Sequence, residues 1–418
     1  MVNLLNMAFI LAQMRHNQWK SEAEIEEIQD KKLRALASYA SEYSPFYRRL
    51  LEKKSIGGLE DLESLPLTRK EDLQEQPKSF VSTRYDLNEL EPVDTSGFTG
   101  QPRRTYLTPS DAECRLALEY RHMVEAGVKP RDVHAHVAHY EFKPRFIQKF
   151  GLFRHYYLSM FDDETENLLK LKGLKPDILS AYPSTLASFA RMNLSMDLDI
   201  SLKTVFSYGE GISSSMRNTI KGSFGCSVRN IYGAAEVNWI AWECEKGSMH
   251  VNSDFMIAEI VDEHGNPMKK GEKGELALTP LWARGAPLLR YTVGDRASLG
   301  STCSCGRGLQ VLKSIEGRDY GAIKLPSGKV ISATMLTLLD DLLCFRTYQI
   351  IQEKEGLFVF RFVPMKGNGP QPEDMAEVER RIKRGCLGEE VKVEFEQVDS
   401  IRKGRTGKLE TVITKVRH

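Results

Sequence analysis

Apolar side chains recur at helical spacing near the N-terminus. Ile25, Leu33 and Leu36 lie between charged residues and predict a helix over residues 22–54, with a break at Ser44-Pro45. The N-terminal part of the chain is therefore expected to be helical, with one interruption.

Two further helix starts are indicated by capping residues. Thr68 and Glu71 have the spacing of a capping box at the start of a helix. Ser110 is expected to cap a helix that runs to Ala126.

The middle of the chain alternates between short apolar runs and helical patterns. The apolar runs predict strands at residues 133–137, 177–180, 204–207 and 228–232. Helical patterns lie between them at residues 184–192 and 213–221. Such alternation is typical of α/β units with a largely parallel sheet.

The pattern changes near residue 250. Two predicted strands at residues 255–261 and 275–279 flank a turn at His264-Gly265-Asn266-Pro267. This arrangement predicts a small antiparallel β subdomain.

The last 100 or so residues have a pattern of their own, because a hairpin around Glu355-Gly356 precedes a helix at 372–383 and a strand at 390–395. We therefore expect an α/β fold with a large N-terminal α/β domain over residues 1–316. A small α+β domain is expected over residues 317–418.

Composition narrows the class of protein. The 418 residues carry a net charge of +1, which gives no reason to expect nucleic acid or an anionic membrane as a partner. Seven cysteines, an odd number, do not resemble a disulfide framework and favour a reducing cytoplasm. The apolar run at 7–12 lacks the flanks of a signal peptide, and we expect a cytoplasmic protein without a membrane span.

A glycine-rich stretch at residues 94–104 is the first candidate for chemistry. Its glycines allow close approach of the backbone to a ligand, and its hydroxyls and arginines suit the phosphates of a nucleotide. It is not the P-loop signature. Taken alone, the stretch is equally consistent with a polar hairpin turn.

Further motifs follow predicted strands or lie near the C-terminus. Glu236 ends a Tyr-Gly-x-x-Glu sequence and offers an oxygen ligand for magnesium, and Asp295 offers a carboxylate for ribose hydroxyls. Lys408 lies in a glycine-softened basic loop, and Tyr208-Gly209-Glu210-Gly211 forms a tight turn after a strand. Each feature alone is commonly a turn, a solvated carboxylate or a basic tail.

The order and spacing of these motifs resemble the adenylate-forming superfamily of acyl-CoA synthetases, and in particular its phenylacetate–CoA ligase branch. The resemblance covers nearly the whole chain and begins with Tyr39-x-x-x-x-Ser44-Pro45-Phe46-Tyr47 and Leu65-Pro66-Leu67-Thr68-Arg69-Lys70-Glu71-Asp72-Leu73. It implies a mobile C-terminal domain, with Lys408 stabilising the adenylation transition state and Glu236 binding magnesium. The ATP-binding residues that it implies are Thr95, Ser96, Gly97, Thr99, Gly100, Gly209, Glu210, Gly211, Tyr232, Gly233, Asp295 and Arg318.

Three departures from the family pattern affect the expectations. Phe98 replaces a threonine of the phosphate loop, so one hydroxyl is missing. Gly317-Arg318-Asp319 is one residue out of step with the usual hinge motif. The segment Tyr140-Glu141-Phe142-Lys143-Pro144 lacks the glycine-rich aromatic stretch of phenylacetate ligases, so the acid is expected to be another aryl or aryl-alkyl carboxylic acid.

A second constellation suits a structural zinc ion. Cys303 and Cys305 form a Cys-x-Cys pair, and Cys244 and His250 lie upstream, giving four ligands of the types that tetrahedral zinc prefers. The alternative is that these cysteines are buried as small apolar residues. Some phenylacetate–CoA ligase relatives carry a similar Cys…His…Cys-x-Cys set, and the resemblance therefore favours zinc.

Three histidines near a predicted strand also invite a metal hypothesis. His134 and His136 would share one face of the strand, and His139 would point to the other. A strand pair without a further ligand is more often packing or a pocket wall, and no catalytic role is assigned to them.

The sequence thus predicts a two-step ligase. A carboxylic acid would attack the α-phosphate of Mg-ATP, and a thiol, most naturally that of CoA, would displace AMP from the acyl adenylate. Two alternatives stay open: transfer of AMP to a hydroxyl of a deazaflavin-type coenzyme, and a non-catalytic zinc-stabilised nucleotide-binding protein. The expected partners are small molecules, and the oligomeric state is left open, a homodimer included.

Overall fold

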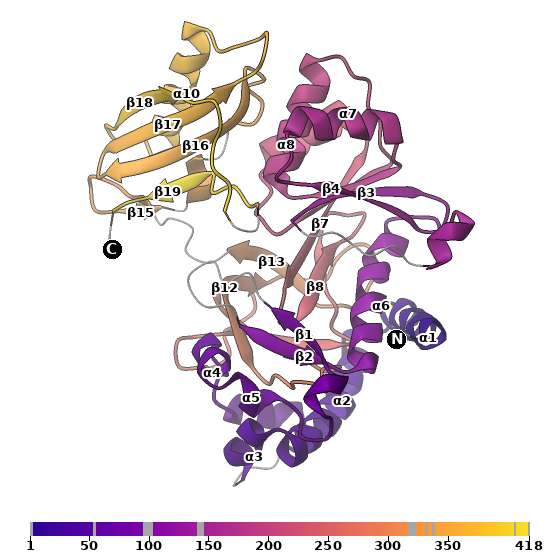
Figure 1. The fold of residues 1–418 in the computed structure, drawn as a ribbon. Helices are drawn as coiled ribbons and strands as arrows, with labels where there is room; N and C mark the ends of the chain where they lie inside the picture. Colours follow the sequence, from indigo (N-terminus) through magenta and orange to yellow (C-terminus); the bar gives the residue numbers. More distant parts are fainter. Residues whose placement is uncertain are drawn as a thin grey trace. The chain divides into compact units, whose positions relative to one another are not determined.

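The computed structural model describes residues 3–52, 56–94, 103–139, 146–316, 323–331, 333–336, 339–404 and 407–416. The chain divides into two compact units (Figure 1). The first unit comprises Met1–Val128 and Ile231–Arg318, and the second comprises Lys129–Asn230 and Asp319–His418. The phosphate-loop residues 95–102, the segment 140–145 and the hinge region 317–322 lie outside the described residues.

Helices make up most of the N-terminal part of the first unit. Ser21 caps α2, and its hydroxyl and the Glu24 carboxylate form a capping box. The helix ends at Ser44 because Pro45 has no N–H to continue the helical hydrogen bonds. Pro45 instead begins α3. The helical elements are α1 (Leu4–Asn17), α2 (Glu22–Tyr43), α3 (Pro45–Leu51), η1 (Leu59–Ser64), α4 (Lys70–Glu75), α5 (Pro77–Phe80), η2 (Leu87–Glu89) and α6 (Pro109–Glu125).

Two predicted caps are wrong by one or two residues. The hydroxyl of Thr68 donates to the Leu289 carbonyl at 2.7 Å, so α4 begins one residue later, where the Asp72 carboxylate accepts from the Arg69 N–H. Helix α6 is capped by Thr108 rather than Ser110, because Pro109 fits the first helical position.

The strands of the first unit are mainly antiparallel. The hairpin β1–β2 leads into and out of the glycine-rich stretch, and the predicted antiparallel pair is confirmed as β10 and β11. That pair does not stand alone, since the strand order continues as β10-β11-β12-β13-β9-β8-β7. The bounds are β1 (Glu91–Asp94), β2 (Arg104–Leu107), β7 (Ser227–Ala234), β8 (Asn238–Glu243), β9 (Met249–Val251), β10 (Met256–Val261), β11 (Gly274–Pro280), β12 (Tyr291–Leu299) and β13 (Val311–Glu316).

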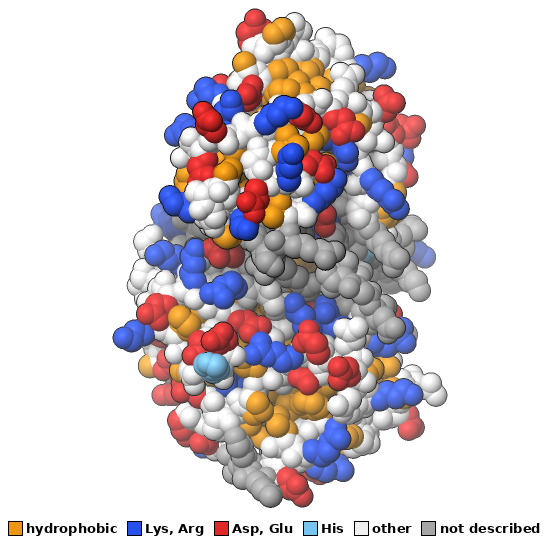
Figure 2. Space-filling view, turned by 90° about the vertical axis from the view of Figure 1, so that its left-hand side faces the viewer, with side chains coloured by type: hydrophobic (Ala, Val, Ile, Leu, Met, Phe, Trp, Pro, Cys, Tyr) orange, Lys and Arg blue, Asp and Glu red, His pale blue; other side chains and the backbone are white. Residues whose placement is uncertain are grey.

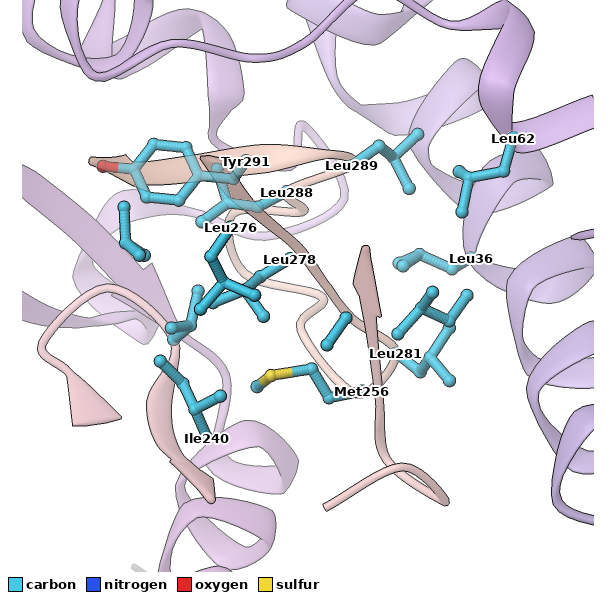
Figure 3. Close-up of a cluster of buried hydrophobic side chains, with 14 of the residues drawn as sticks. Leu36, Leu62, Ile240, Met256, Leu276, Leu278, Leu281, Leu288, Leu289 and Tyr291 are labelled. Atoms are coloured by element: carbon cyan, nitrogen blue, oxygen red, sulfur yellow. The ribbon is translucent and has the colours of Figure 1, made fainter. Parts of the chain in front are cut away.

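The core of the first unit joins these strands to the N-terminal helices. Leu36 from α2 and Leu62 from η1 pack in one cluster with Leu276 and Leu278 from β11. Figure 3 shows Tyr291 at the border of this cluster, with its ring near the leucines and its hydroxyl directed away from them. Strand β12 is therefore anchored by burial at the residue where it begins.

The N-terminal part of the second unit contains the predicted parallel sheet, in the order β6-β5-β3-β4. In Figure 1 helices α7 and α8 lie over one face of β3 and β4, and Ala135 and Val137 pack beneath them in one apolar cluster. The bounds are β3 (Val133–Ala138), η3 (Phe146–Phe150), β4 (Arg154–Ser159), α7 (Glu164–Leu174), β5 (Ile178–Ala181), α8 (Pro183–Ser195), β6 (Thr204–Tyr208) and α9 (Ser214–Phe224).

The C-terminal part of the second unit has its own sheet and core. Val378 and Ile382 of α10 pack on Phe358 and Phe360 of β17, and the strand order is β18-β17-β16-β19. The bounds are β14 (Ile323–Lys324), β15 (Val330–Ile331), η4 (Ala333–Leu336), β16 (Phe345–Lys354), β17 (Leu357–Pro364), α10 (Pro372–Gly385), β18 (Lys392–Gln397) and β19 (Val412–Thr414).

The surface mixes charges of both signs. On the face drawn in Figure 2, lysine and arginine side chains are interspersed with aspartate and glutamate. Among the described residues, no helix has the length and apolar character required to cross a membrane.

Candidate functional site

The predicted magnesium ligand Glu236 lies just after β7 in the first unit and is 6% exposed. Its Oε1 accepts hydrogen bonds from Arg103 Nε at 3.0 Å and from the Tyr291 hydroxyl at 3.1 Å. Tyr291 is fully buried, so the packing of β12 fixes the position of this carboxylate. The positive charge of Arg103 balances the negative charge of Glu236, and this offsets part of the desolvation cost of burying the pair.

Asp295 is held in a similar way. The hydroxyl of Tyr232 in β7 donates to Asp295 Oδ2 of β12 at 2.6 Å. The adjacent Gly233 is required by the backbone, since a Cβ there would lie 2.7 Å from the Asn238 carbonyl oxygen. Two predicted ATP-binding residues therefore form one hydrogen-bonded pair in the first unit.

In the second unit the loop that carries Lys408 lies against the turn that follows β6. Gly209 has a φ of +80°, and a Cβ there would lie 2.8 Å from the Tyr182 ring and 3.4 Å from Lys408 Cε. The Lys408 ammonium is 5.5 Å from the centroid of the Tyr182 ring. Only glycine allows this close approach.

Glu210 links the two loops through backbone hydrogen bonds. Its carboxylate accepts from the Ser184 N–H at 3.1 Å and from the Leu409 N–H at 3.2 Å. Burial raises the pKa of Glu210, and the nearby charge of Lys408 opposes that shift. Burial, and then the charge of Lys408, lowers the pKa of His139 at the end of β3. The charge of Lys408 therefore acts on two ionisable side chains of the second unit, Glu210 and His139.

The four predicted zinc ligands converge in the first unit. The sulfurs of Cys244 and Cys303 are 3.7 Å apart, and Cys305 Sγ lies 3.2 Å from His250 Nε2. All four ligand atoms lie within 4.8 Å of one another. Burial lowers the pKa of His250 to about 4, so its imidazole is neutral, as a metal ligand must be. The donor set and the spacing fit a closed tetrahedral site.

The loop that bears two of these cysteines is held by Arg307. Its guanidinium pairs with Glu125 at 2.9 Å and with Glu245 at 3.0 Å, and it lies 4.6 Å from the centroid of the Trp19 ring. This network positions the loop next to Cys244, in the turn after β8.

Comparisons with known protein families give matches to two separate segments of the chain. Residues 92–285 match the family described as AMP-binding enzyme, and residues 325–415 match the CapK C-terminal domain. The phenylacetate-coenzyme A ligase of Thermus thermophilus is 28% identical over 356 residues, which cover 79% of this chain and 78% of that protein. That of Escherichia coli is 27% identical over 305 residues, which cover 66% of this chain and 67% of the relative.

The fold is also that of a solved ligase. A structure of 2-hydroxyisobutyryl-CoA ligase in the postadenylation state superposes with a TM-score of 0.78 at 21% identity, covering 96% of this chain and 92% of that one. This chain is similar to the adenylate-forming superfamily, and in particular to its phenylacetate–CoA ligase-like branch.

The described site residues fall into separate groups. Tyr232, Gly233, Glu236 and Asp295 lie together in the first unit, and Gly209, Glu210, Gly211 and Lys408 lie together in the second. The predicted residues Thr95, Ser96, Gly97, Thr99, Gly100 and Arg318 lie outside the described part of the chain.

Sequence reasoning missed the neighbours that position these groups. Tyr182 follows directly after β5, and a search of strand ends would have found it. Arg103 lies within the glycine-rich stretch and Tyr291 lies four residues before Asp295, but their shared contact with Glu236 has no sequence signal because Arg103 and Glu236 are 133 positions apart.

Proposed function

We propose that this enzyme activates a carboxylic acid with ATP and transfers the acyl group to the thiol of CoA. In the first step the carboxylate oxygen attacks the α-phosphorus, the bond to the β-phosphate oxygen breaks, and pyrophosphate leaves. In the second step the thiol sulfur attacks the acyl carbon, AMP leaves, and the thiol proton passes to solvent. The family of the chain and the preserved order of its motifs support this reaction.

One observation carries the proposal: the Lys408 loop lies on the turn at Gly209–Gly211. In this position the Lys408 ammonium group lies beside the turn that is predicted to pass beneath the nucleotide base. The fixed positive charge would stabilise the negative charge that develops on the phosphates, without rearrangement at the moment of reaction. The backbone links through Glu210 support this role.

The remaining roles follow from the groups available. Asp295 would accept hydrogen bonds from the ribose hydroxyls, and Tyr232 would hold its carboxylate in place. Glu236 supplies an oxygen ligand of the kind that magnesium prefers, and magnesium, when bound, neutralises phosphate charge. Arg103 would keep Glu236 oriented in the protein.

The acid is proposed to be an aryl or aryl-alkyl carboxylic acid. The relatives in Thermus thermophilus and Escherichia coli are named phenylacetate-coenzyme A ligases, which supports this class. The departures at residues 140–144 argue against phenylacetate itself.

A screen of carboxylic acids for ATP–pyrophosphate exchange tests the function. We expect exchange that depends on the acid, followed by AMP release and thioester formation when CoA is added. Product that retains AMP on a deazaflavin-type coenzyme would favour the adenylyltransferase alternative. Absence of any pyrophosphate release across the screen would favour the non-catalytic nucleotide-binding alternative.

We further propose that residues 317–418 act as a C-terminal lid, with Arg318 near the hinge. The match of residues 325–415 to a C-terminal domain family supports a separate unit there. Lys408 is needed in the first step, and the acceptor needs room in the second, so the lid must change position between them.

The enzyme is proposed to act in the cytoplasm, with a small-molecule acid and CoA as its partners, and to require neither nucleic acid nor a membrane. The oligomeric state, a homodimer included, is left to measurement.

We also propose a structural zinc ion at Cys244, His250, Cys303 and Cys305. The ion would join the loop after β12 to the turn after β8, and so brace β12, which carries Asp295, and β8, which follows Glu236. It would not contact substrate.

Replacing Cys303 with serine is expected to remove one equivalent of zinc and to lower Tm, because metal binding contributes to folding free energy. Each 1 kcal/mol lost would lower Tm by about 2–4 °C in a domain of this size. Metal content and thermal melting measure both effects. Cys226→Ser, at a buried cysteine of the second unit, is the control and should keep its zinc. Freshly purified protein without zinc would end the proposal.

A further inference from the structure

Three histidines converge on one face of the parallel sheet in the second unit. His134 and His136 are two residues apart on β3, so their side chains share a face. The parallel register places His155 of β4 beside His134. This face is opposite to the one on which Ala135 and Val137 pack beneath the helices. His139, the third histidine noted in the sequence, is not part of the group.

The ring nitrogens are close enough to share one ion. One ligand nitrogen from each histidine lies within 4.8 Å of the other two, and His136 Nε2 lies 2.8 Å from His155 Nδ1. The centroids of the His134 and His136 rings are 3.7 Å apart. In a tetrahedral site with metal–nitrogen bonds of about 2.0–2.1 Å, ligand nitrogens are about 3.4 Å apart. The 2.8 Å separation is somewhat shorter than that value, and the limit of 4.8 Å on the other separations allows it.

The surroundings favour a built site over a surface cluster. His134 is 3% exposed and His136 is 6% exposed, while His155 on β4 is only half-buried and gives access from solvent. Ser180 of β5 shares the face, and its hydroxyl lies 2.6 Å from His134 Nε2. Such a hydroxyl can orient an imidazole ligand or bind a water on the ion.

We propose that His134, His136 and His155 form a binding site for a divalent cation of the zinc class. Imidazole nitrogens suit zinc, cobalt, nickel and copper ions, and the hard ions magnesium and calcium prefer oxygen. Three protein ligands leave one coordination position open, which water would fill next to Ser180. The ion would also fasten β4, whose described ladder runs along β3, to the centre of the sheet. This site is independent of the cysteine site and of the proposed ligase reaction.

Zinc content of tag-free protein tests the site. The parent and the variant His155→Gln are equilibrated with a slight excess of zinc, separated from free metal and analysed for zinc per chain. We expect His155→Gln to hold one equivalent less than the parent. His264→Gln, at an exposed histidine on a turn of the first unit, should match the parent. This difference does not depend on whether the cysteine site holds zinc.

A measurement on the unaltered chain guards against misfolding of the variant. In cobalt-substituted parent protein we expect visible absorption from a site with nitrogen ligands, in addition to any sulfur-to-cobalt charge transfer from the cysteine site. X-ray absorption at the zinc edge should give more nitrogen than sulfur neighbours, since two filled sites have four imidazole and three thiolate ligands. Equal zinc in the parent and a folded His155→Gln, or a purely sulfur-rich spectrum, would overturn the proposal and leave a hydrogen-bonded histidine cluster.

Discussion

Replacing Lys408 with alanine is expected to slow adenylation about 100–1000-fold, which is about 2.7–4 kcal/mol, the effect of losing one preorganised group that stabilises developing negative charge. ATP affinity should change only a few-fold, because the charge matters most in the transition state. Transfer from a pre-made acyl adenylate to CoA should survive, since the proposed lid motion removes the lysine from that step. Pyrophosphate exchange, equilibrium dialysis with ATP, and thioester formation measure the three quantities.

Lys415→Ala is the matched control, because this exposed lysine of the same unit pairs with Glu353 and its loss should cost little. Lys408→Arg tests position as well as charge, since the planar guanidinium does not reproduce a compact ammonium. Equal losses in adenylation and thioester formation for Lys408→Ala would contradict the assigned role.

The strand and helix pattern was sufficient to predict much of the fold. The alternation at 133–232 gave the parallel sheet, because buried parallel strands are short apolar runs between helices. Glu236 and Asp295 could be singled out as candidates because each lies in or next to a predicted strand, where a sheet presents side chains at defined positions. The caps of α4 and α6 could not be placed accurately from the sequence. The hydroxyl of Thr68 is used in a tertiary contact with Leu289, and the backbone geometry of Pro109 sets the start of α6.

Contacts between segments that are distant in the chain could not be predicted from the sequence. The register of β3 and β4 places His155 beside His134, but nothing in the residues between them specifies which strand lies next to which. The same holds for Glu210, whose sequence context suggests a nucleotide contact and whose carboxylate accepts hydrogen bonds from two backbone segments. Lys408 was singled out from the sequence of its loop, and its neighbour Tyr182 became visible only in three dimensions.

Replacing Glu236 with glutamine is expected to move the magnesium dependence of adenylation to higher concentration and to lower its maximal rate about 100-fold. A neutral amide is a weaker ligand than a carboxylate for a hard cation. The same change removes a buried counter-charge from Arg103, so part of the effect arises from a disturbed site. Rates of pyrophosphate exchange over a magnesium titration measure both components.

Tyr291→Phe separates the two components. It removes the hydroxyl that donates to Glu236 Oε1 and keeps the carboxylate, and the ring stays in the core with Leu276 and Leu278. We expect a smaller loss of rate, about 10-fold, which corresponds to about 1.5 kcal/mol, the lower end for a hydrogen bond to a charged group, with the magnesium midpoint unchanged. A Glu236→Gln enzyme with the magnesium titration and rate of the parent would instead make Glu236 a structural partner of Arg103, because a ligand to the catalytic ion cannot be neutralised without shifting the ion's affinity.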